Sequence, residues 1–381
     1  MRDVKPETPI SEFLSERIAG GDFPSAVYLV AERGRARFAD ALGDAVRSPQ
    51  RRPATAETIY DLASLTKPLV TGLLAAILVE RGHVELDGAL ADYLPEFGRA
   101  DKRALTVRHL LTHTSGLPAW RPLYLLAEGD RERVLELVAA GPLEQPPGAR
   151  VVYSDLGFIT LGLLLQKVSG LRLADLAGRE IFAPLGLRRT FFNPAKSFQT
   201  ETAACESGGN MYERAMCEVG HGGAPAADWR DGDIWGEVHD GNAYFLGGAA
   251  GHAGLFSTAA ETFRLASQFL AASTELLRPE TCALFRTNLT EGLNEARSFA
   301  WQLASTPDST AGPRLAPDSF GHLGFTGTSC WLDPNTERVF VLLTNRTHAR
   351  PLPFANINGA RRRFHTLAAG ALERDADRTG E

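Results

Sequence analysis

The stretch with the clearest capacity for chemistry holds a serine and a lysine three residues apart, Ser64 and Lys67. An apolar run over residues 68–79 follows and stops at Gly82, which predicts a helix that begins near the serine. Residues three apart on a helix share a face, so the hydroxyl and the ammonium lie together. The serine gains from the helix dipole, and the lysine can lower the pKa of the group that takes the serine proton. The pattern predicts a nucleophilic serine, against the alternative of a helix-capping serine beside a solvated lysine.

A tyrosine and an aspartate, Tyr153 and Asp155, stand before a second apolar run, residues 159–168, which has helical length and ends at Gly170. The tyrosine therefore lies on a loop at a helix entrance, where its phenol can face a cleft. The alternative is a half-buried tyrosine whose hydroxyl bonds to the backbone.

A third group, His322-Leu323-Gly324, lies within a run of strand-forming residues, 320–332. That run, a turn at 333–335 and the apolar run 338–345 predict a β-hairpin. The histidine and glycine are therefore expected on a strand.

Two histidines four residues apart, His109 and His113, could form a metal pair on one helix face. The intervening residues supply no general-base glutamate and no third ligand is nearby, so structural histidines are the favoured interpretation, and neither a metal nor another cofactor is expected. His252, which follows the small residues 247–251, could be catalytic, although a packed, hydrogen-bonded histidine is the favoured interpretation.

The composition argues against several classes of protein. The 381 residues carry a net charge of −6, and no basic run is longer than 361–363, so no nucleic-acid partner is expected. Charged residues are spread through the first twenty positions, so no signal peptide is expected and the location is expected to be cytoplasmic. The longest apolar stretch, 69–79, is too short to span a bilayer, so no membrane partner is expected. No C-x-x-C spacing occurs and the cysteines are expected to be reduced, although Cys205 and Cys217 could pair in an oxidising compartment.

The predicted elements place strands at both ends of the chain and helices between them. These elements are a helix over 8–20, strands over 25–31, 35–41 and 297–303, the hairpin described above, and a last helix over 355–374. We expect an α+β fold in a single catalytic domain, 1–381, in which an antiparallel β-sheet is flanked by N- and C-terminal helices and carries a large, mainly helical insertion. Residues 1–81 and 255–381 would form the α/β lobe and 82–254 the helical lobe. A long irregular loop within it, 201–237, is of the kind that shapes a substrate cleft.

The three groups, in this order, resemble the motifs of the serine β-lactamase and penicillin-binding-protein superfamily. The likeness is closest to the class C branch, which includes the family VIII carboxylesterases, and it spans about residues 11–345. Further similar stretches are residues 110–117, 250–258 and 321–328. The resemblance implies a β-lactamase/transpeptidase-like fold and a reaction through an acyl-serine intermediate.

By this resemblance, Ser64 is the acylated nucleophile and Lys67 lowers the barrier to its deprotonation. Tyr153 is the general base, with its phenolate favoured by Lys67, and a protonated His322 would add to that effect. The backbone N–H groups of Ser64 and Phe325 form the oxyanion hole. Acylation releases an alcohol or an amine, and a water activated at Tyr153 then hydrolyses the acyl-enzyme.

Three residues are expected to bind substrate, namely Asp155, His322 and Gly324. The small Gly324 lets substrate lie against its strand. Many lactam-hydrolysing members have a lysine where His322 stands, and a partly charged histidine should hold a substrate carboxylate less well. Asp155 stands where class C lactamases have asparagine, and a carboxylate cannot donate a hydrogen bond to the acyl amide of a penicillin.

These departures favour small carboxylic esters as the substrate of a serine hydrolase, with weak β-lactamase activity as a side reaction. The expected partner is therefore a small-molecule ester or amide. A D-amino-acid peptidase or amidase and a β-lactamase are alternatives with the same nucleophile, and an acyltransferase is another, because an alcohol can replace water. A non-catalytic penicillin-binding or sensor domain is the alternative from a different class. The sequence does not indicate an oligomeric state.

Overall fold

The computed structural model describes residues 4–221 and 229–379. Within them the larger sheet has seven strands in the order β3-β2-β1-β10-β9-β8-β7, and every neighbouring pair is antiparallel. Its strands are β1 (Ser25–Glu32), β2 (Arg35–Val46), β3 (Arg52–Pro53), β7 (Gln302–Leu303), β8 (Phe320–Leu323), β9 (Ser329–Asp333) and β10 (Arg338–Thr344). The two ends of the chain meet where β1 pairs with β10, with Val27 opposite Leu343. The predicted α+β fold with an antiparallel sheet is confirmed.

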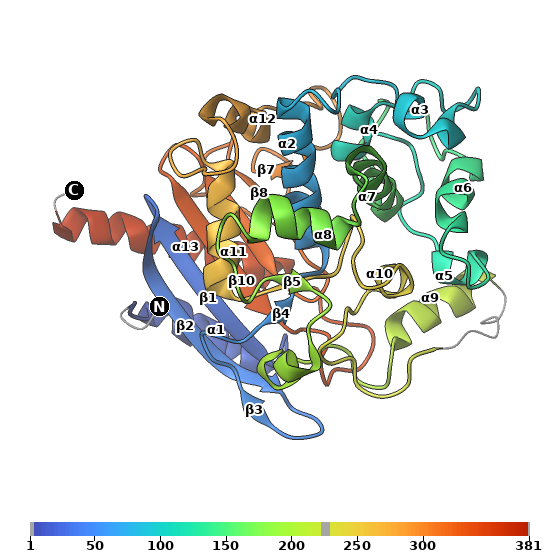
Figure 1. Cartoon of the computed structure of the whole chain (residues 1–381). Coiled ribbons are helices and arrows are strands. Elements are labelled where there is room, and N and C mark those ends of the chain that lie inside the picture. Colours follow the sequence, from blue (N-terminus) through green and yellow to red (C-terminus); the bar gives the residue numbers. More distant parts are fainter. Residues whose placement is uncertain (1–3, 222–228, 380–381) are drawn as a thin grey trace.

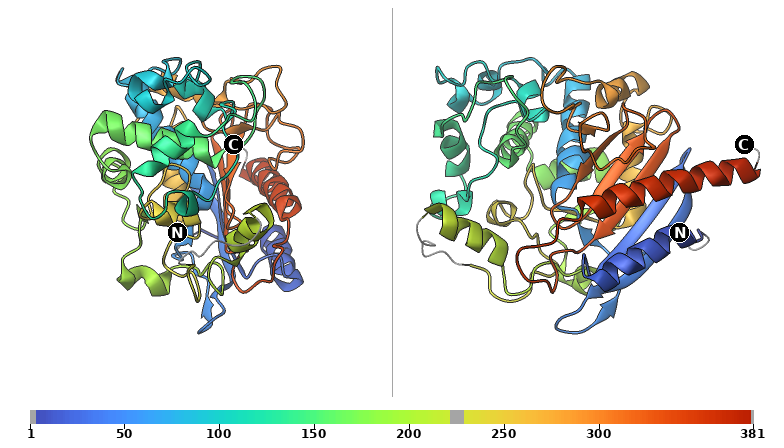
Figure 2. Two further views of the ribbon diagram at one scale, coloured as in Figure 1. Left: turned by 90° about the vertical axis from the view of Figure 1, so that its right-hand side faces the viewer. Right: turned by 180° about the vertical axis from the view of Figure 1, so that it is seen from behind.

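Alternate residues of the central strands face two separate cores. Tyr28 and Phe340 pack with α1 (Thr8–Gly20) and α13 (Asn358–Thr379), and Figure 2 shows both helices lying across this face of the sheet. The intervening residues, Val27 among them, belong to a larger core that includes α2 (Leu73–Glu80) and α11 (Ala259–Ala266). Because both faces of the sheet are covered, the central strands read as continuous apolar runs rather than as a polar and apolar alternation.

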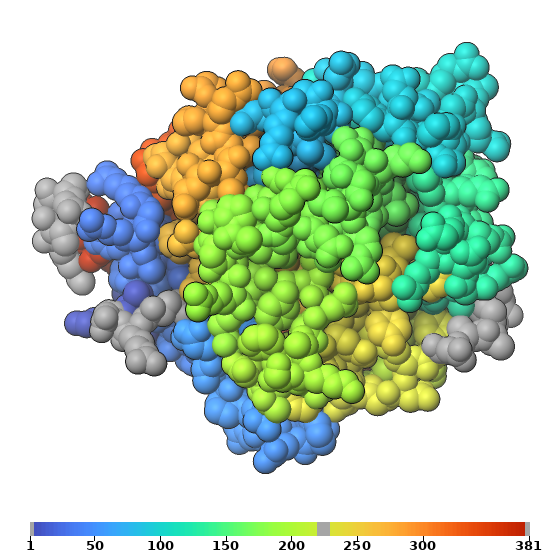
Figure 3. Space-filling model, viewed as in Figure 1, coloured from blue at the N-terminus to red at the C-terminus, as the bar shows by residue number. Residues whose placement is uncertain are grey.

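Most of the remaining helices lie beside α2, away from the sheet (Figure 1). They are α3 (Leu90–Tyr93), α4 (Val107–Leu111), α5 (Leu123–Leu126), α6 (Arg133–Ala140), α7 (Asp155–Ser169), α8 (Leu173–Ala177), α9 (Met211–His221) and α10 (Gly241–Phe245), with α12 (Ala283–Arg286) near the sheet. A small sheet of β4 (Tyr60–Asp61), β6 (Leu255–Ser257) and β5 (Phe191–Phe192) lies between the two groups. Figure 3 shows the green segment around α8 spread over the middle of this face. The expected lobe boundaries at 81/82 and 254/255 stay a prediction.

The helical stretch that carries Ser64 is built from three kinds of turn. A 3-10 turn (Ala63–Leu65) is followed by a π-helical segment (Lys67–Gly72) and then by α2. Pro68 fits near the start because the amides of a first turn have no intrahelical partner. By length and composition residues 63–80 could cross a membrane, but 83% of that window is buried inside the protein. This stretch is therefore a core element that holds Ser64 at its entrance.

Several predicted boundaries are wrong. Arg297 makes only an isolated bridge to Gln302, because the positive φ of Ala300 interrupts the predicted strand 297–303. Gly327, with φ of 109°, closes a turn that splits the run 320–332 into β8 and β9. The expected irregular loop 201–237 contains α9, and residues 222–228 of that loop lie outside the described residues. The last helix begins and ends later than expected, as α13.

Candidate active site

Ser64 lines a cavity of about 450 Å³, and its closest charged neighbour is the buried ammonium of Lys67. Lys67 Nζ donates to Ser64 Oγ at 3.0 Å and lies 2.7 Å from Asp155 Oδ1. It also donates to the carbonyl oxygen of His252 at 3.1 Å. Burial alone would lower the pKa of Lys67, but the carboxylate of Asp155 and the phenol of Tyr153 outweigh burial and raise it. Lys67 is therefore a cation at neutral pH that can stabilise negative charge on Ser64 Oγ.

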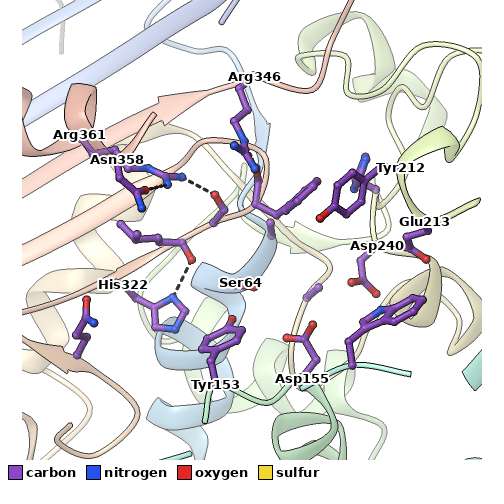
Figure 4. A pocket seen from close by; sticks show the side chains of 18 of the residues that line it. Ser64, Tyr153, Asp155, Tyr212, Glu213, Asp240, His322, Arg346, Asn358 and Arg361 are labelled. Carbon is purple, nitrogen blue, oxygen red and sulfur yellow. Dashed lines mark hydrogen bonds between the residues drawn. The ribbon is translucent and has the colours of Figure 1, made fainter. Parts of the chain in front are cut away.

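Tyr153 lies against this ion pair, with its ring centroid 4.8 Å from Lys67 Nζ. Figure 4 shows its hydroxyl directed toward Ser64. Burial raises the pKa of Tyr153; Lys67 opposes this, while Asp155 adds to it, and the net direction is upward. The phenol is therefore protonated at neutral pH. The effect of Lys67 that the sequence predicted is present, but burial and Asp155 exceed it.

His322 is neutral, so the expected contribution from a protonated His322 is wrong. Burial, together with the nearby charges of Lys67 and Arg297, holds the pKa of His322 well below its usual range. Its Nδ1 lies 2.9 Å from the carbonyl oxygen of Leu323, which assigns the proton to Nδ1 and leaves Nε2 as an acceptor. Among the residues that the structure describes, Nε2 has no hydrogen-bond partner. The ring lies 5.9 Å from the Tyr153 ring between centroids.

The turn after β8 is hydrogen-bonded directly to the residues that precede Ser64. Thr326 Oγ1 donates to the carbonyl oxygen of Asp61 at 2.8 Å, and Thr328 Oγ1 donates to that of Leu62 at 3.0 Å. Phe325 lies in this turn, lines the cavity and makes no backbone N–H hydrogen bond to any described residue. Its N–H is thus available beside the nucleophile, as an oxyanion hole requires.

Gly324 is needed for the contact between these two turns. A Cβ at this position would lie 2.0 Å from Thr328 Oγ1 and 2.5 Å from the carbonyl oxygen of Leu62. The sequence interpretation gave this glycine the role of leaving room for substrate. The structure adds a packing reason, since any side chain here would push the Phe325 turn away from Ser64.

A loop around His113 positions Tyr153 and Asp155. Ser154 donates its backbone N–H to His113 Nδ1 at 3.0 Å, and the His113 ring lies 4.6 Å from the Tyr153 ring. The Ser154 hydroxyl accepts from Gly157 N–H at 3.1 Å, which caps the start of α7. The cap and the histidine fix the two residues on either side of Ser154 at the cavity.

His109 and His113, which were considered as a metal pair, have separate structural roles. His109 Nδ1 accepts from the backbone N–H of Thr106 in a capping box at the start of α4. His113 lies beyond the end of that helix with a positive φ of 57°. Across residues 4–221 and 229–379, no group of three histidine, cysteine, aspartate or glutamate side chains is arranged to hold a metal ion.

The cavity has two oppositely charged walls that the sequence motifs did not indicate. Figure 4 shows carboxylates to the right of Ser64, and His322 with Arg361 to the left. Of the lining residues outside the predicted set, Tyr212, Glu213 and Asp240 lie on the first side, Arg361 lies on the second, and Arg346 lies above Ser64. Trp120 and Arg297 also line the cavity. Arg361 belongs to the arginine triplet 361–363, which indicated only surface charge in the sequence. The sequence could have indicated that Arg361 is buried, because it falls on the side of the predicted last helix that faces the sheet.

Comparison with known proteins agrees with this architecture. The model of the Beta-lactamase family matches residues 10–362. The chain belongs to the Beta-lactamase family. It is 31% identical over 366 residues to an Escherichia coli (strain K12) protein named "Putative D-alanyl-D-alanine carboxypeptidase", covering 89% of this chain and 82% of that protein. The resemblance predicted from the three motifs is confirmed, and the chain is a serine hydrolase of the β-lactamase and penicillin-binding-protein type.

Two solved structures show the same fold. EstCE1, described as a hydrolase with promiscuous acyltransferase activity, has a TM-score of 0.70 at 24% identity, with 94% of this chain and 98% of that chain covered. A class C β-lactamase from Rhodobacter sphaeroides has a TM-score of 0.69 at 20% identity, with 96% and 99% covered.

Proposed function

We propose that the protein hydrolyses an amide or ester bond next to a substrate carboxylate, as in a peptide that ends in a D-amino acid. Ser64, Lys67 and Tyr153 would carry the reaction. The observation that carries the proposal is a pair of arginines that line the cavity, Arg361 on the side of His322 and Arg346 above Ser64 in Figure 4. The name of the Escherichia coli relative supports the same substrate class.

Neither arginine forms an ion pair with a described carboxylate. Arg346 Nε donates to the carbonyl oxygen of Phe325 at 2.7 Å, and Arg361 Nη2 donates to that of Gly324 at 2.6 Å. Burial, and then the charge of Arg346, lower the pKa of Arg361 to about 9, so it remains a cation at neutral pH. Two uncompensated guanidinium groups beside the substrate strand favour a bound carboxylate. They supply the positive charge that neutral His322 lacks.

The reaction follows from the geometry around Ser64. In the small fraction of the protein in which Tyr153 is a phenolate, Ser64 Oγ attacks the carbonyl carbon as its proton passes to Tyr153, while Lys67 stabilises the developing charge. The N–H groups of Ser64 and Phe325 would hold the carbonyl oxygen as it becomes an oxyanion. Tyr153 then gives its proton to the departing amine or alkoxide. In the second half, a water takes the place of the leaving group and loses its proton to Tyr153 as its oxygen attacks the acyl carbon. Tyr153 then returns that proton to Ser64 Oγ as the bond between Ser64 and the acyl group breaks and the acid leaves.

A small-ester hydrolase is the second candidate. It is favoured by the neutral charge of His322, which places no fixed cation at the position where many lactam-hydrolysing members carry lysine. EstCE1, which has the same fold, is described as a hydrolase with promiscuous acyltransferase activity, which makes an alcohol acceptor a further outcome of the same acyl-enzyme.

The test compares kcat/KM for an acyl-D-alanyl-D-alanine peptide with that for its C-terminal amide. We expect the free carboxylate to be preferred by about tenfold or more, since a hydrogen bond to a charged group contributes about 1.5–3 kcal/mol. Arg346→Gln should reduce that ratio toward one. Equal rates on acid and amide in the parent, with rapid turnover of p-nitrophenyl butyrate, would favour the ester hydrolase instead.

A further inference from the structure

A buried carboxylate outside the three motifs holds two of the residues that line the cavity. Glu206 is 2% exposed. Its Oε2 accepts from Nε2 of His239 at 2.8 Å, and its Oε1 accepts from the backbone N–H of Tyr212, the second residue of α9, at 2.8 Å. Because a buried carboxylate that loses a donor is costly, both bonds resist displacement. Glu206 therefore fixes the ring of His239 and the start of α9 at the cavity.

The two residues that Glu206 holds both pack against the side chain of Phe325. The His239 ring stacks on the Phe325 ring, with centroids 5.4 Å apart and an interplanar angle of 28°. The Tyr212 ring lies 4.7 Å from the same ring between centroids, and the guanidinium carbon of Arg346 lies 4.8 Å from its centroid. A side chain enclosed in this way restricts its own backbone, so the packing helps to direct the N–H of Phe325.

The backbone of His239 supports the other half of the oxyanion hole. His239 N–H donates to Asp61 Oδ2 at 2.8 Å, and Ala63 N–H donates to Asp61 Oδ1 at 2.8 Å. Ala63, directly before Ser64, has a φ of 47°. This left-handed conformation is strained in a residue with a Cβ and persists only where the surroundings hold it. The bonds through Asp61 therefore help to set the direction of the Ser64 N–H.

We propose that Glu206, acting through His239 and Tyr212, is a positioning residue for the oxyanion hole formed by the N–H groups of Ser64 and Phe325. The proposal rests on the Ser64 reaction described above, in which these two groups hold the carbonyl oxygen. The alternative is that Glu206 only holds its own loop and α9 in the fold. That alternative predicts a loss of stability without any change in how the carbonyl oxygen is bound.

The test changes the atom that the oxyanion hole binds. p-Nitrophenyl butyrate is compared with its thiono analogue, in which a sulfur replaces the carbonyl oxygen and accepts hydrogen bonds weakly. The kcat/KM of each compound is divided by its rate constant with hydroxide, so that intrinsic reactivity cancels. We expect the parent to prefer the oxygen ester by about tenfold or more, since one oxyanion-hole donor contributes about 10²–10³ in kcat. A smaller amount of folded protein lowers both rates equally and leaves this oxygen-to-sulfur ratio unchanged.

Glu206→Ala should lower kcat/KM for the oxygen ester by about tenfold or more and bring the oxygen-to-sulfur ratio toward one. Glu206→Gln should keep the parental ratio, because an amide can accept from Tyr212 N–H and donate to His239 Nε2 in the other ring tautomer. Glu261→Ala is the matched control, since Glu261 on α11 also accepts two backbone N–H groups but lies outside the cavity. It should leave the ratio unchanged.

A parental ratio in Glu206→Ala, or an equal fall of the ratio in Glu261→Ala, would overturn the positioning role and leave the proposed hydrolase standing. A parent that hydrolyses the oxygen ester without preferring it would do the same. If Glu206→Ala does not fold, Tyr212→Ala takes its place with the same predicted ratio, because Tyr212 is only half-buried and its ring contacts Phe325.

If the parent hydrolyses neither compound, the hydrolase proposal fails, and crystal structures of the parent and the variant decide the positioning role separately. A displaced backbone at Ala63 or Phe325 in the variant would support it. Superimposable turns in the two structures would overturn it.

Discussion

At the scale of single residues, Asp155 sets the charge balance of the site. Its carboxylate is 2.7 Å from Lys67 Nζ and raises the pKa of Tyr153. Asp155→Asn removes this negative charge, so the pKa of Tyr153 should fall and a larger fraction of the phenolate should exist at neutral pH. The acid limb of the kcat/KM profile should therefore move to lower pH. Profiles of the parent and the variant on one ester, between about pH 6 and 10, measure the shift.

Asp175→Asn is the matched control, because this aspartate pairs with Arg172 on the exposed surface of α8. It should leave the profile where it is. An unchanged acid limb in Asp155→Asn, or a shift to higher pH, would contradict the assignment of that limb to Tyr153.

Tyr153 itself should be required for proton transfer and not for stability. Tyr153→Phe keeps the ring that packs on His113 and removes only the hydroxyl. We expect kcat to fall by about 10²–10⁴, the usual contribution of a general acid–base group, with an unchanged melting temperature. Tyr244→Phe, at an exposed position, is the control for loss of a hydroxyl. A variant with near-parental turnover would remove Tyr153 from the mechanism.

The residues of the three motifs could be found from the sequence because their types and spacing are local. The ion pair between Lys67 and Asp155 could not, because its partners lie on separate elements that only tertiary packing brings together. The acidic wall has the same origin, since Glu213 and Asp240 come from α9 and the entrance of α10. The charge states of the site residues could not be predicted either, because the lowered pKa of His322 results from burial, which is known only from the folded structure.

At the scale of elements, the close approach of α7 to residues 250–253 places Lys67. A Cβ at Gly162 of α7 would lie 2.8 Å from Gly251 Cα, next to the His252 carbonyl that accepts from Lys67. Gly162→Ala should therefore lower the free energy of unfolding by about 1–3 kcal/mol, measured by urea denaturation, because the core cannot absorb the added methyl without a shift.

Gly178→Ala is the control, since this helical glycine has open space where a Cβ would stand. It should be neutral or slightly stabilising, because alanine favours a helix over glycine by up to about 1 kcal/mol. If both alanine variants were equally stable, the tight contact would not constrain the fold.

The elements that could be predicted were those with strong apolar patterns. The runs that became β1 and β10 are buried on both faces and were recognised, as was the helical stretch behind Ser64. The strand expected over 297–303 is shortened to β7 because a positive φ at Ala300 is not visible in a β-rich composition. Helix α9 was missed because glycine-rich neighbours obscured its pattern.

At the scale of the whole molecule, the packing of α13 on the sheet should make stability depend on pH. Burial lowers the pKa of His365 from 6.5 to about 3, and its Nδ1 lies 2.6 Å from the carbonyl oxygen of Thr310. Below about pH 6.5 His365 is protonated in the unfolded chain but stays neutral in the folded protein. The free energy of unfolding therefore decreases as the pH falls toward 3. The slope expected from this histidine is about 1.4 kcal/mol per pH unit.

Urea denaturation between pH 7 and about 4 should show a weaker pH dependence in His365→Phe than in the parent. His83→Phe, at an exposed position, should retain the slope of the parent. Equal slopes in the parent and in His365→Phe would show that His365 does not contribute to the acid sensitivity.

The central claim is that substrate acylates Ser64. The most direct measurement is acid quenching of the protein during turnover of p-nitrophenyl butyrate, followed by mass spectrometry of its peptides. We predict one butyryl group on the peptide that contains Ser64 and none in Ser64→Ala, which should also lose ester turnover. An acyl group on another residue, or ester turnover that persists in Ser64→Ala, would contradict the account.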